Sequence, residues 1–69
     1  MHLIINGESR QFEPRQIESL TSLMRALEIK EATGTAVAVN DEVIPRGQWQ
    51  THTLRPGDRV EVIRATSGG

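Results

Sequence analysis

Apolar and polar residues alternate over the first twelve residues of the chain, which read MHLIINGESRQF. Leu3 and Ile5 fall on one face of this extended segment. Asn6-Gly7 follows, the pair favoured in a type I′ turn because both residues tolerate positive φ. We therefore expect a β-hairpin whose second strand ends at Phe12, since Pro14 cannot continue a strand ladder.

The apolar spacing then changes to a helical period in the segment SLTSLMRAL. Residues at i, i+3, i+4 and i+7 share one face of a helix, and here these are Leu20, Leu23, Met24 and Leu27. Ser19 precedes them and can cap the first turn through its hydroxyl oxygen. The pattern predicts a helix of about ten residues that ends near Glu28 or Ile29.

Short extended pieces follow the helix. Residues 36–39 (AVAV) predict a strand, Asn40-Asp41 supplies turn residues, and Val43-Ile44 predicts an edge strand that Pro45 stops. The segment RGQWQ, residues 46–50, is expected to form a loop or one irregular turn.

The last strand is predicted to follow a turn at residues 55–58 (RPGD), in which proline presets φ and glycine permits the reversal. Val60 and Val62 then alternate toward the core. The residues between and beside them are expected to face outward: Arg59, Glu61 and Ile63.

The order β-β-α-β-β-β predicts an α+β domain over residues 1–64, with one helix on one face of a mixed sheet of four to five strands. A helix between strands allows an outer strand to return parallel to the first by a right-handed crossover. The other face of the sheet is then expected to be solvated. Residues 65–69 are expected to form a flexible C-terminal tail.

Composition restricts the classes of function. The 69 residues suffice for one domain and include no cysteine for disulfides or a thiolate metal site. Eight basic and nine acidic residues are scattered along the chain, which argues against a nucleic-acid partner. Neither a membrane-length apolar run nor a signal-peptide pattern is visible, so we expect a soluble, cytoplasmic protein without a membrane partner.

The sequence contains no motif typical of catalysis or metal binding. His2 and His52 are far apart and lack metal-ligand spacing, and neither a Gly-x-Ser-x-Gly elbow nor a phosphate-binding P-loop is present. We expect neither an enzyme nor a metal site. Trp49 either closes one end of the core, which is the commoner role, or forms a partner hot spot.

The alternation along the predicted strands places two isoleucine side chains on the outer face of the sheet. Ile4 and Ile63 would lie on the solvated face of the sheet, Ile63 close to the tail. Together they would form a small docking patch for a partner. The alternative is ordinary exposure of single apolar residues, and both interpretations remain open.

The last five residues, ATSGG, have no apolar anchor and are expected to project from the domain. Gly68 and Gly69 lack Cβ atoms, so their backbone can enter a narrow channel in a partner. An α-carboxyl group is an anion at neutral pH. Such an unhindered carboxylate can attack the α-phosphate of ATP when another protein supplies the nucleotide and metal site, and the resulting acyl-adenylate can accept sulfur.

Four stretches together resemble the ThiS family, the sulfur carriers of thiamine biosynthesis, over essentially the whole chain. They are IINGE, AVAVNDEVIPRGQW, LRPGDRVEVIRA and the terminal GG. The resemblance implies a ubiquitin-like β-grasp fold. It also implies that Gly69 is adenylated and converted to a thiocarboxylate, with Thr66, Ser67 and Gly68 threaded into the partner.

The same resemblance implies the partners. They are an E1-like adenylating enzyme of the ThiF type, which uses ATP and magnesium, a sulfur donor protein, and a thiazole synthase of the ThiG type. The carrier itself would bind no cofactor and would act as a co-substrate. Two alternatives remain open: a carrier like the small subunit of molybdopterin synthase, and a β-grasp interaction or RNA-binding module whose diglycine is incidental.

Two departures from the family pattern affect the expectations. A glycine often closes the helix where Glu28 stands, and Glu28 in the left-handed region costs about 1 kcal/mol, which predicts a different helix end. The residues 65–67 (ATS) replace the small or apolar residues expected before the diglycine, which affects the fit to a partner and leaves the chemistry intact.

Overall fold

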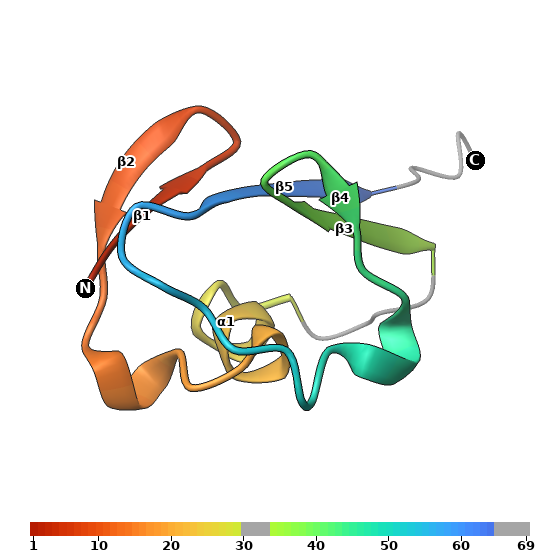
Figure 1. Ribbon diagram of the computed structural model, residues 1–69, viewed down its shortest axis with the longest axis horizontal. Helices are drawn as coiled ribbons and strands as arrows, with labels where there is room; N and C mark the ends of the chain where they lie inside the picture. The colour runs from red at the N-terminus through yellow and green to blue at the C-terminus, as the bar shows by residue number, and fades with distance from the viewer. Residues whose placement is uncertain (30–33, 65–69) are drawn as a thin grey trace.

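The computed structural model describes residues 1–29 and 34–64, in which a single mixed sheet lies over one helix (Figure 1). The five strands are arranged in the order β2-β1-β5-β3-β4. Their bounds are His2–Ile5 for β1, Glu8–Gln11 for β2, Thr35–Val39 for β3, Glu42–Val43 for β4 and Arg59–Arg64 for β5. The predicted α+β class is confirmed, with five strands.

The N-terminal hairpin forms as the alternation predicts. β1 and β2 pair antiparallel, with Ile5 opposite Glu8, and the connecting Asn6 and Gly7 have φ values of 48° and 84°. Positive φ at both positions is the signature of a type I′ turn. The second strand stops one residue earlier than expected, at Gln11, and the amide of Phe12 donates to the Met1 carbonyl at 2.8 Å.

Helix α1 (Leu20–Ala26) is shorter than the predicted ten residues, and it begins as expected. The Ser19 hydroxyl accepts a hydrogen bond from the amide of Ser22 at 3.2 Å. Leu20, Leu23 and Met24 are buried against the sheet, and Leu27 packs at the edge of the core. The predicted apolar face of the helix is therefore confirmed.

The end of α1 corrects the expectation for Glu28. This residue has a φ of 61°, in the left-handed region. The amide of Glu28 donates to the Arg25 carbonyl at 3.0 Å and the amide of Ile29 to the Met24 carbonyl at 2.9 Å, which together make a Schellman motif. Glu28 thus occupies the position usually given to glycine, because the two capping bonds and the partly buried Ile29 hold it there.

The strand parallel to β1 is β5, and it lies in the centre of the sheet. The expectation that an outer strand returns parallel was wrong in this respect, because β3 and β4 add to the far side of β5. β4 is limited to Glu42–Val43, although the amide of Ile44 still donates to the Val37 carbonyl at 2.9 Å.

The core lies between the inner face of the sheet, α1 and the segment from Ile44 to Leu54. Trp49 follows the 3-10 turn η2 (Arg46–Gln48) and is 5% exposed, and its indole N–H donates to the Ile44 carbonyl at 2.8 Å. The interpretation of Trp49 as a core residue is confirmed. A second 3-10 turn, η1 (Pro14–Gln16), leads from β2 toward α1.

Candidate functional site

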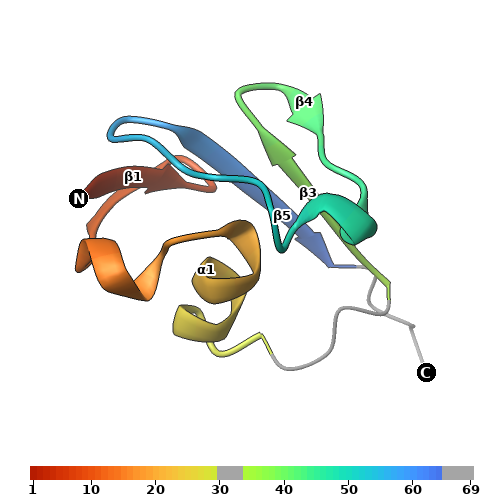
Figure 2. The same cartoon turned by 60° about the horizontal axis from the view of Figure 1, so that its bottom comes forward.

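Strand β5 leads to the C-terminal segment and has a strand on each side (Figure 2). β3 pairs antiparallel with β5 along all five of its residues, from Val39 opposite Val60 to Thr35 opposite Arg64. Val60 is fully buried and Val62 partly buried, while Arg59, Glu61 and Ile63 are exposed. The predicted alternation is confirmed. The pairing with β3 holds β5 in place as far as Arg64.

β1 follows β5 for a much shorter distance. Only Ile4 and Ile5 pair with β5, opposite Arg59 and Val60. Beyond Val60, β5 is bonded on this side by the side chain of Asn6. The Asn6 Oδ1 accepts a hydrogen bond from the amide of Val62 at 2.8 Å. A hydrogen bond to a residue 56 positions away is not visible in the sequence, where Asn6 signals only a turn.

A second asparagine binds the beginning of β5. The Asn40 Oδ1 accepts from the amide of Arg59 at 2.9 Å, and its Nδ2 donates to Asp58 Oδ1 at 3.0 Å. Asp58 also accepts from the amide of Arg55 at 2.8 Å through its other oxygen, which closes the predicted turn at residues 55–58. Gly57 has a φ of 87° in this turn, as a type II turn requires at its third residue.

The residues predicted to carry the chemistry, Thr66, Ser67, Gly68 and Gly69, lie outside the described residues. Their roles therefore stay predictions. The described part of the site is the strand that leads to them, the face of the sheet beside it and the contacts that hold both in place.

The open face of the sheet carries two large exposed apolar side chains, Val43 and Ile63, at 68% and 59% exposure. Ile63 lies opposite Ala36 on β3, and Val43 lies opposite Ala38 on the same strand. Two alanines on β3 lie between these larger side chains; Ala36 is exposed, while Ala38 is only 9% exposed and also lies opposite the exposed Glu61 of β5. We call these four apolar residues the β3–β5 apolar patch.

Ile4 has the predicted outward parity but lies away from this patch. It pairs with Arg59, four residues before Ile63 on β5, which places the two isoleucines about 13 Å apart along the strand. Ile4 is only partly exposed, between Ser9 of β2 and Arg59 of β5. The structure places Val43, on the other side of β3, on the same face of the sheet as Ile63. The sequence did not single out Val43 because its strand has only two residues.

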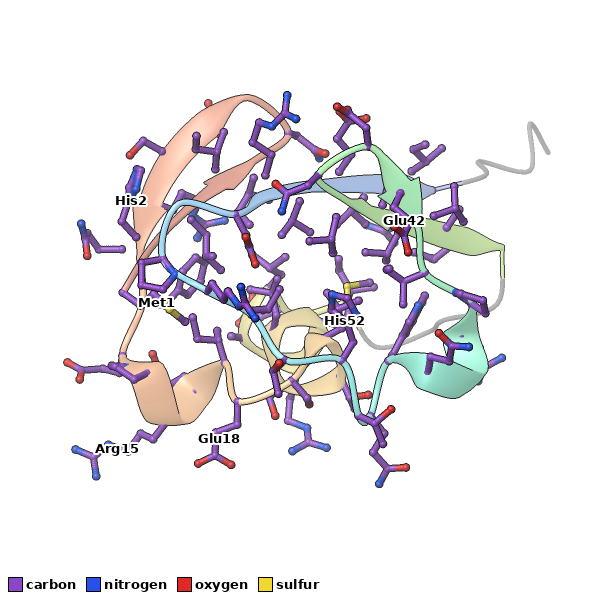
Figure 3. The ribbon with its side chains drawn as sticks, viewed as in Figure 1. Met1, His2, Arg15, Glu18, Glu42 and His52 are labelled. Carbon is purple, nitrogen blue, oxygen red and sulfur yellow. The ribbon has the colours of Figure 1, made fainter. Side chains whose placement is uncertain are left out.

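A polar groove of about 450 Å³ lies between the β3–β4 turn and the segment that follows η2. Its polar lining includes Glu42, His52, Arg55 and Asp58. Figure 3 labels Glu42 on β4 and His52 in the segment after η2. Small-molecule sites are usually mostly apolar, so this polar, open groove does not resemble one.

The two histidines lie apart in the structure (Figure 3). The ring of His2 hydrogen-bonds to the Ser9 hydroxyl across the β1–β2 hairpin, which explains His2 as a cross-strand surface residue. Within residues 1–29 and 34–64, no group of three His, Asp or Glu side chains could hold a metal ion. The helices of the same residues are too short to cross a bilayer.

Comparison with known proteins identifies the family. The ThiS family matches residues 3–69 of the chain. The sulfur carrier protein ThiS of Escherichia coli is 29% identical over 69 residues, and the alignment covers all of both chains.

Two solved structures have the same fold. The crystal structure of the thiamine biosynthesis protein ThiS from Geobacter metallireducens matches with a TM-score of 0.84 and 30% identity, and the whole of both chains is covered. A solution structure of a thiamine biosynthesis protein from the same organism matches with a TM-score of 0.83 at 30% identity, covering all of this chain and 88% of that one. With its ubiquitin-like β-grasp fold, the chain belongs to the ThiS family of sulfur carrier proteins in thiamine biosynthesis.

Proposed function

We propose that Gly69 carries the sulfur, as a thiocarboxylate at its α-carboxyl group. The observation that supports this most directly is that the family match extends through residue 69 and so includes the diglycine. Glycine at the last two positions suits this role because the absence of Cβ atoms leaves the carbonyl carbon open to attack.

The proposed chemistry has two steps. The Gly69 carboxylate attacks the α-phosphorus of ATP, pyrophosphate leaves, and an acyl-adenylate forms in an adenylating enzyme of the ThiF type that supplies the magnesium site. Sulfide-level sulfur (HS⁻) supplied by a sulfur donor protein then attacks the carbonyl carbon: the new C–S bond forms as the C–O bond to AMP breaks, AMP leaves, and no oxidation or reduction is needed. The chain is a co-substrate in both steps, and we place it in the cytoplasm because adenylation requires ATP.

The thiocarboxylate would then donate its sulfur to a thiazole synthase of the ThiG type. Thr66, Ser67 and Gly68 are proposed to thread into both partners, so that the domain itself stays outside their active sites. Strand β5 supports this arrangement, since its pairing with β3 continues to Arg64, directly before the segment that must thread.

We propose that the partners dock on the open face of the sheet, chiefly on the β3–β5 apolar patch, with Ile4 at its periphery. The exposure of Ile63 near the end of β5 and of Val43 on the same face of the sheet supports this choice. Replacing Ile63 with serine should raise the carrier concentration needed for half-maximal adenylation. An unchanged requirement would remove Ile63 from the docking surface.

The test of the carrier function is the intact mass of the protein after incubation with its cognate adenylating enzyme, ATP, magnesium and a sulfur donor. We expect a gain equal to the mass difference between one sulfur and one oxygen atom. A mass that never changes, with a partner proven active on another carrier, would refute the proposal.

Deletion of Gly69 is the matched control. The variant should gain no sulfur but should melt at the same temperature as the parent, because the core that the described residues form is complete before Arg64. A large loss of thermal stability on deletion would instead indicate a structural role for the terminal residue.

A further inference from the structure

The parallel ladder between β1 and β5 ends early. The amide of Ile4 donates to the Asp58 carbonyl at 3.0 Å, and the amide of Asn6 donates to the Val60 carbonyl at 2.9 Å. The next step of a parallel ladder would run from the amide of Val62 to a β1 carbonyl. At Asn6 and Gly7, however, the main chain turns away into the hairpin.

The side chain of Asn6 fills the missing step of the ladder. Its Oδ1 accepts from the Val62 amide at 2.8 Å, where the main-chain carbonyl of a longer strand would accept. Its Nδ2 points to the Val62 carbonyl at 3.5 Å, a longer contact. A carboxamide has the same donor and acceptor groups as a peptide unit, which is why it can replace one.

This substitution matters because of where it occurs along β5. Successive amides of a strand point to opposite sides, so the Val62 amide points away from β3 and toward the β1 side. Without Asn6, the β1 side of β5 would have no partner among the described residues beyond Val60. The Asn6 side chain extends the hydrogen bonding on the β1 side of β5 from Val60 to Val62, two residues before Arg64.

We propose that Asn6 is a positioning residue for the sulfur-carrying terminus. Its carboxamide fixes the last part of β5, the strand that leads to the sulfur-carrying terminus. The inference rests on the proposed function, since it assigns Asn6 a part in presenting Gly69 to the partner enzymes. The simpler explanation is that Asn6 is present only to form the turn.

Substitution of Asn6 by glycine tests which of these two explanations is right. Asn6→Gly keeps a residue that adopts positive φ in a type I′ turn but removes the carboxamide. Asn6→Asp keeps both the turn and the oxygen that accepts from Val62. The first measurement is amide hydrogen exchange by NMR, with Val60 as the internal reference.

We expect Asn6→Gly to lower the protection of the Val62 amide about fivefold to tenfold relative to Val60, as loss of one hydrogen bond predicts. Asn6→Asp should retain most of that protection. If the Val62 amide in Asn6→Gly stays as protected as in the parent, the carboxamide does not hold β5 and the proposal fails. This measurement needs no partner enzyme, so it is independent of the proposed function.

The second measurement is the rate of adenylation by the cognate enzyme as a function of carrier concentration, at a temperature where both variants are fully folded. A less fixed β5 lowers the fraction of carrier in which this strand has the conformation that the enzyme binds, so KM should rise severalfold for Asn6→Gly while kcat stays unchanged. Asn6→Asp should restore a KM close to that of the parent. Equal KM values for the parent and Asn6→Gly would refute the positioning role, whereas failure of the parent to be adenylated would refute the proposed function instead.

Discussion

The two hairpin turns of the domain look alike but hold opposite ends of the same strand. Each begins with asparagine at positive φ, 48° for Asn6 and 50° for Asn40, and each continues at positive φ. The side chain of Asn40 binds the amide of Arg59, where β5 begins. The side chain of Asn6 binds the amide of Val62, near its end.

The two turns differ in the number and length of the hydrogen bonds that their asparagine side chains make to β5 and its preceding turn. Asn40 uses both ends of its carboxamide at 2.9 and 3.0 Å, and one of its partners is the carboxylate of Asp58. Asn6 makes one short bond and one long contact. Of the two asparagine side chains, Asn40 therefore holds the beginning of β5 more strongly than Asn6 holds its end.

The largest expected effect comes from removing each carboxamide in turn. Asn40→Gly should destabilise the domain by about 1–2 kcal/mol and Asn6→Gly by about 0.5–1 kcal/mol, because the first loses two good hydrogen bonds and the second loses one. In a domain of this size, 1 kcal/mol shifts the melting temperature by about 4–8 °C. Thermal unfolding followed by circular dichroism measures both changes.

The two variants are controls for each other, since the asparagine-to-glycine change has the same effect on the unfolded chain in both. Equal losses of stability, or a larger loss for Asn6→Gly, would contradict the proposed order of the two turns.

An effect smaller than that of Asn40→Gly, and of opposite sign, is expected at the helix end. Glu28 has a positive φ, like the turn residues, but its side chain makes no hydrogen bond to the described residues that would offset the strain. Glu28→Gly keeps the Schellman bonds and relieves the strained backbone, so it should stabilise the domain by about 0.5–1 kcal/mol. Urea unfolding measures the gain, and a loss of stability would show that the Glu28 side chain contributes more than its backbone costs.

The smallest effect is expected at the second residue of the Asn40 turn. Asp41 has a φ of 70°, but its carboxylate pairs with the Arg59 guanidinium at 2.8 Å. Both side chains are largely exposed, so the pair contributes little, about 0–1 kcal/mol. Asp41→Gly removes the pair and the strain together, and its stability in the same urea assay should differ from the parent by less than about 0.5 kcal/mol. A gain as large as that of Glu28→Gly would mean that the ion pair contributes nothing.

Local patterns predicted most of the fold. The alternation of Leu3 with Ile5 and of Val60 with Val62 gave the inner face of the sheet, and the helical spacing from Leu20 to Leu27 gave the face of α1. These predictions succeeded because burial of one face imposes a period on the sequence. The position of β5 in the centre of the sheet could not be predicted in this way, since strand order depends on pairing between distant segments.

The candidate site was predictable only in part. The diglycine and the resemblance of the whole chain indicated the sulfur carrier family, which the comparisons confirm. The roles of residues 66–69 stay predictions. That Val43 shares the open face with Ile63 was not predicted, because this follows from their registers opposite two alanines of β3.

By itself the sequence determined where the chain turns, since Asn6-Gly7 and Asn40-Asp41 are pairs that accept positive φ, and which side chains enter the core. Only the tertiary structure decided what the two asparagine side chains bind. Their partners on β5 lie 19 and 56 positions away, and no local preference specifies a hydrogen bond over such distances. Pairing of β5 between β1 and β3 brings these groups together, and a turn residue thereby becomes a support for the strand that leads to Gly69.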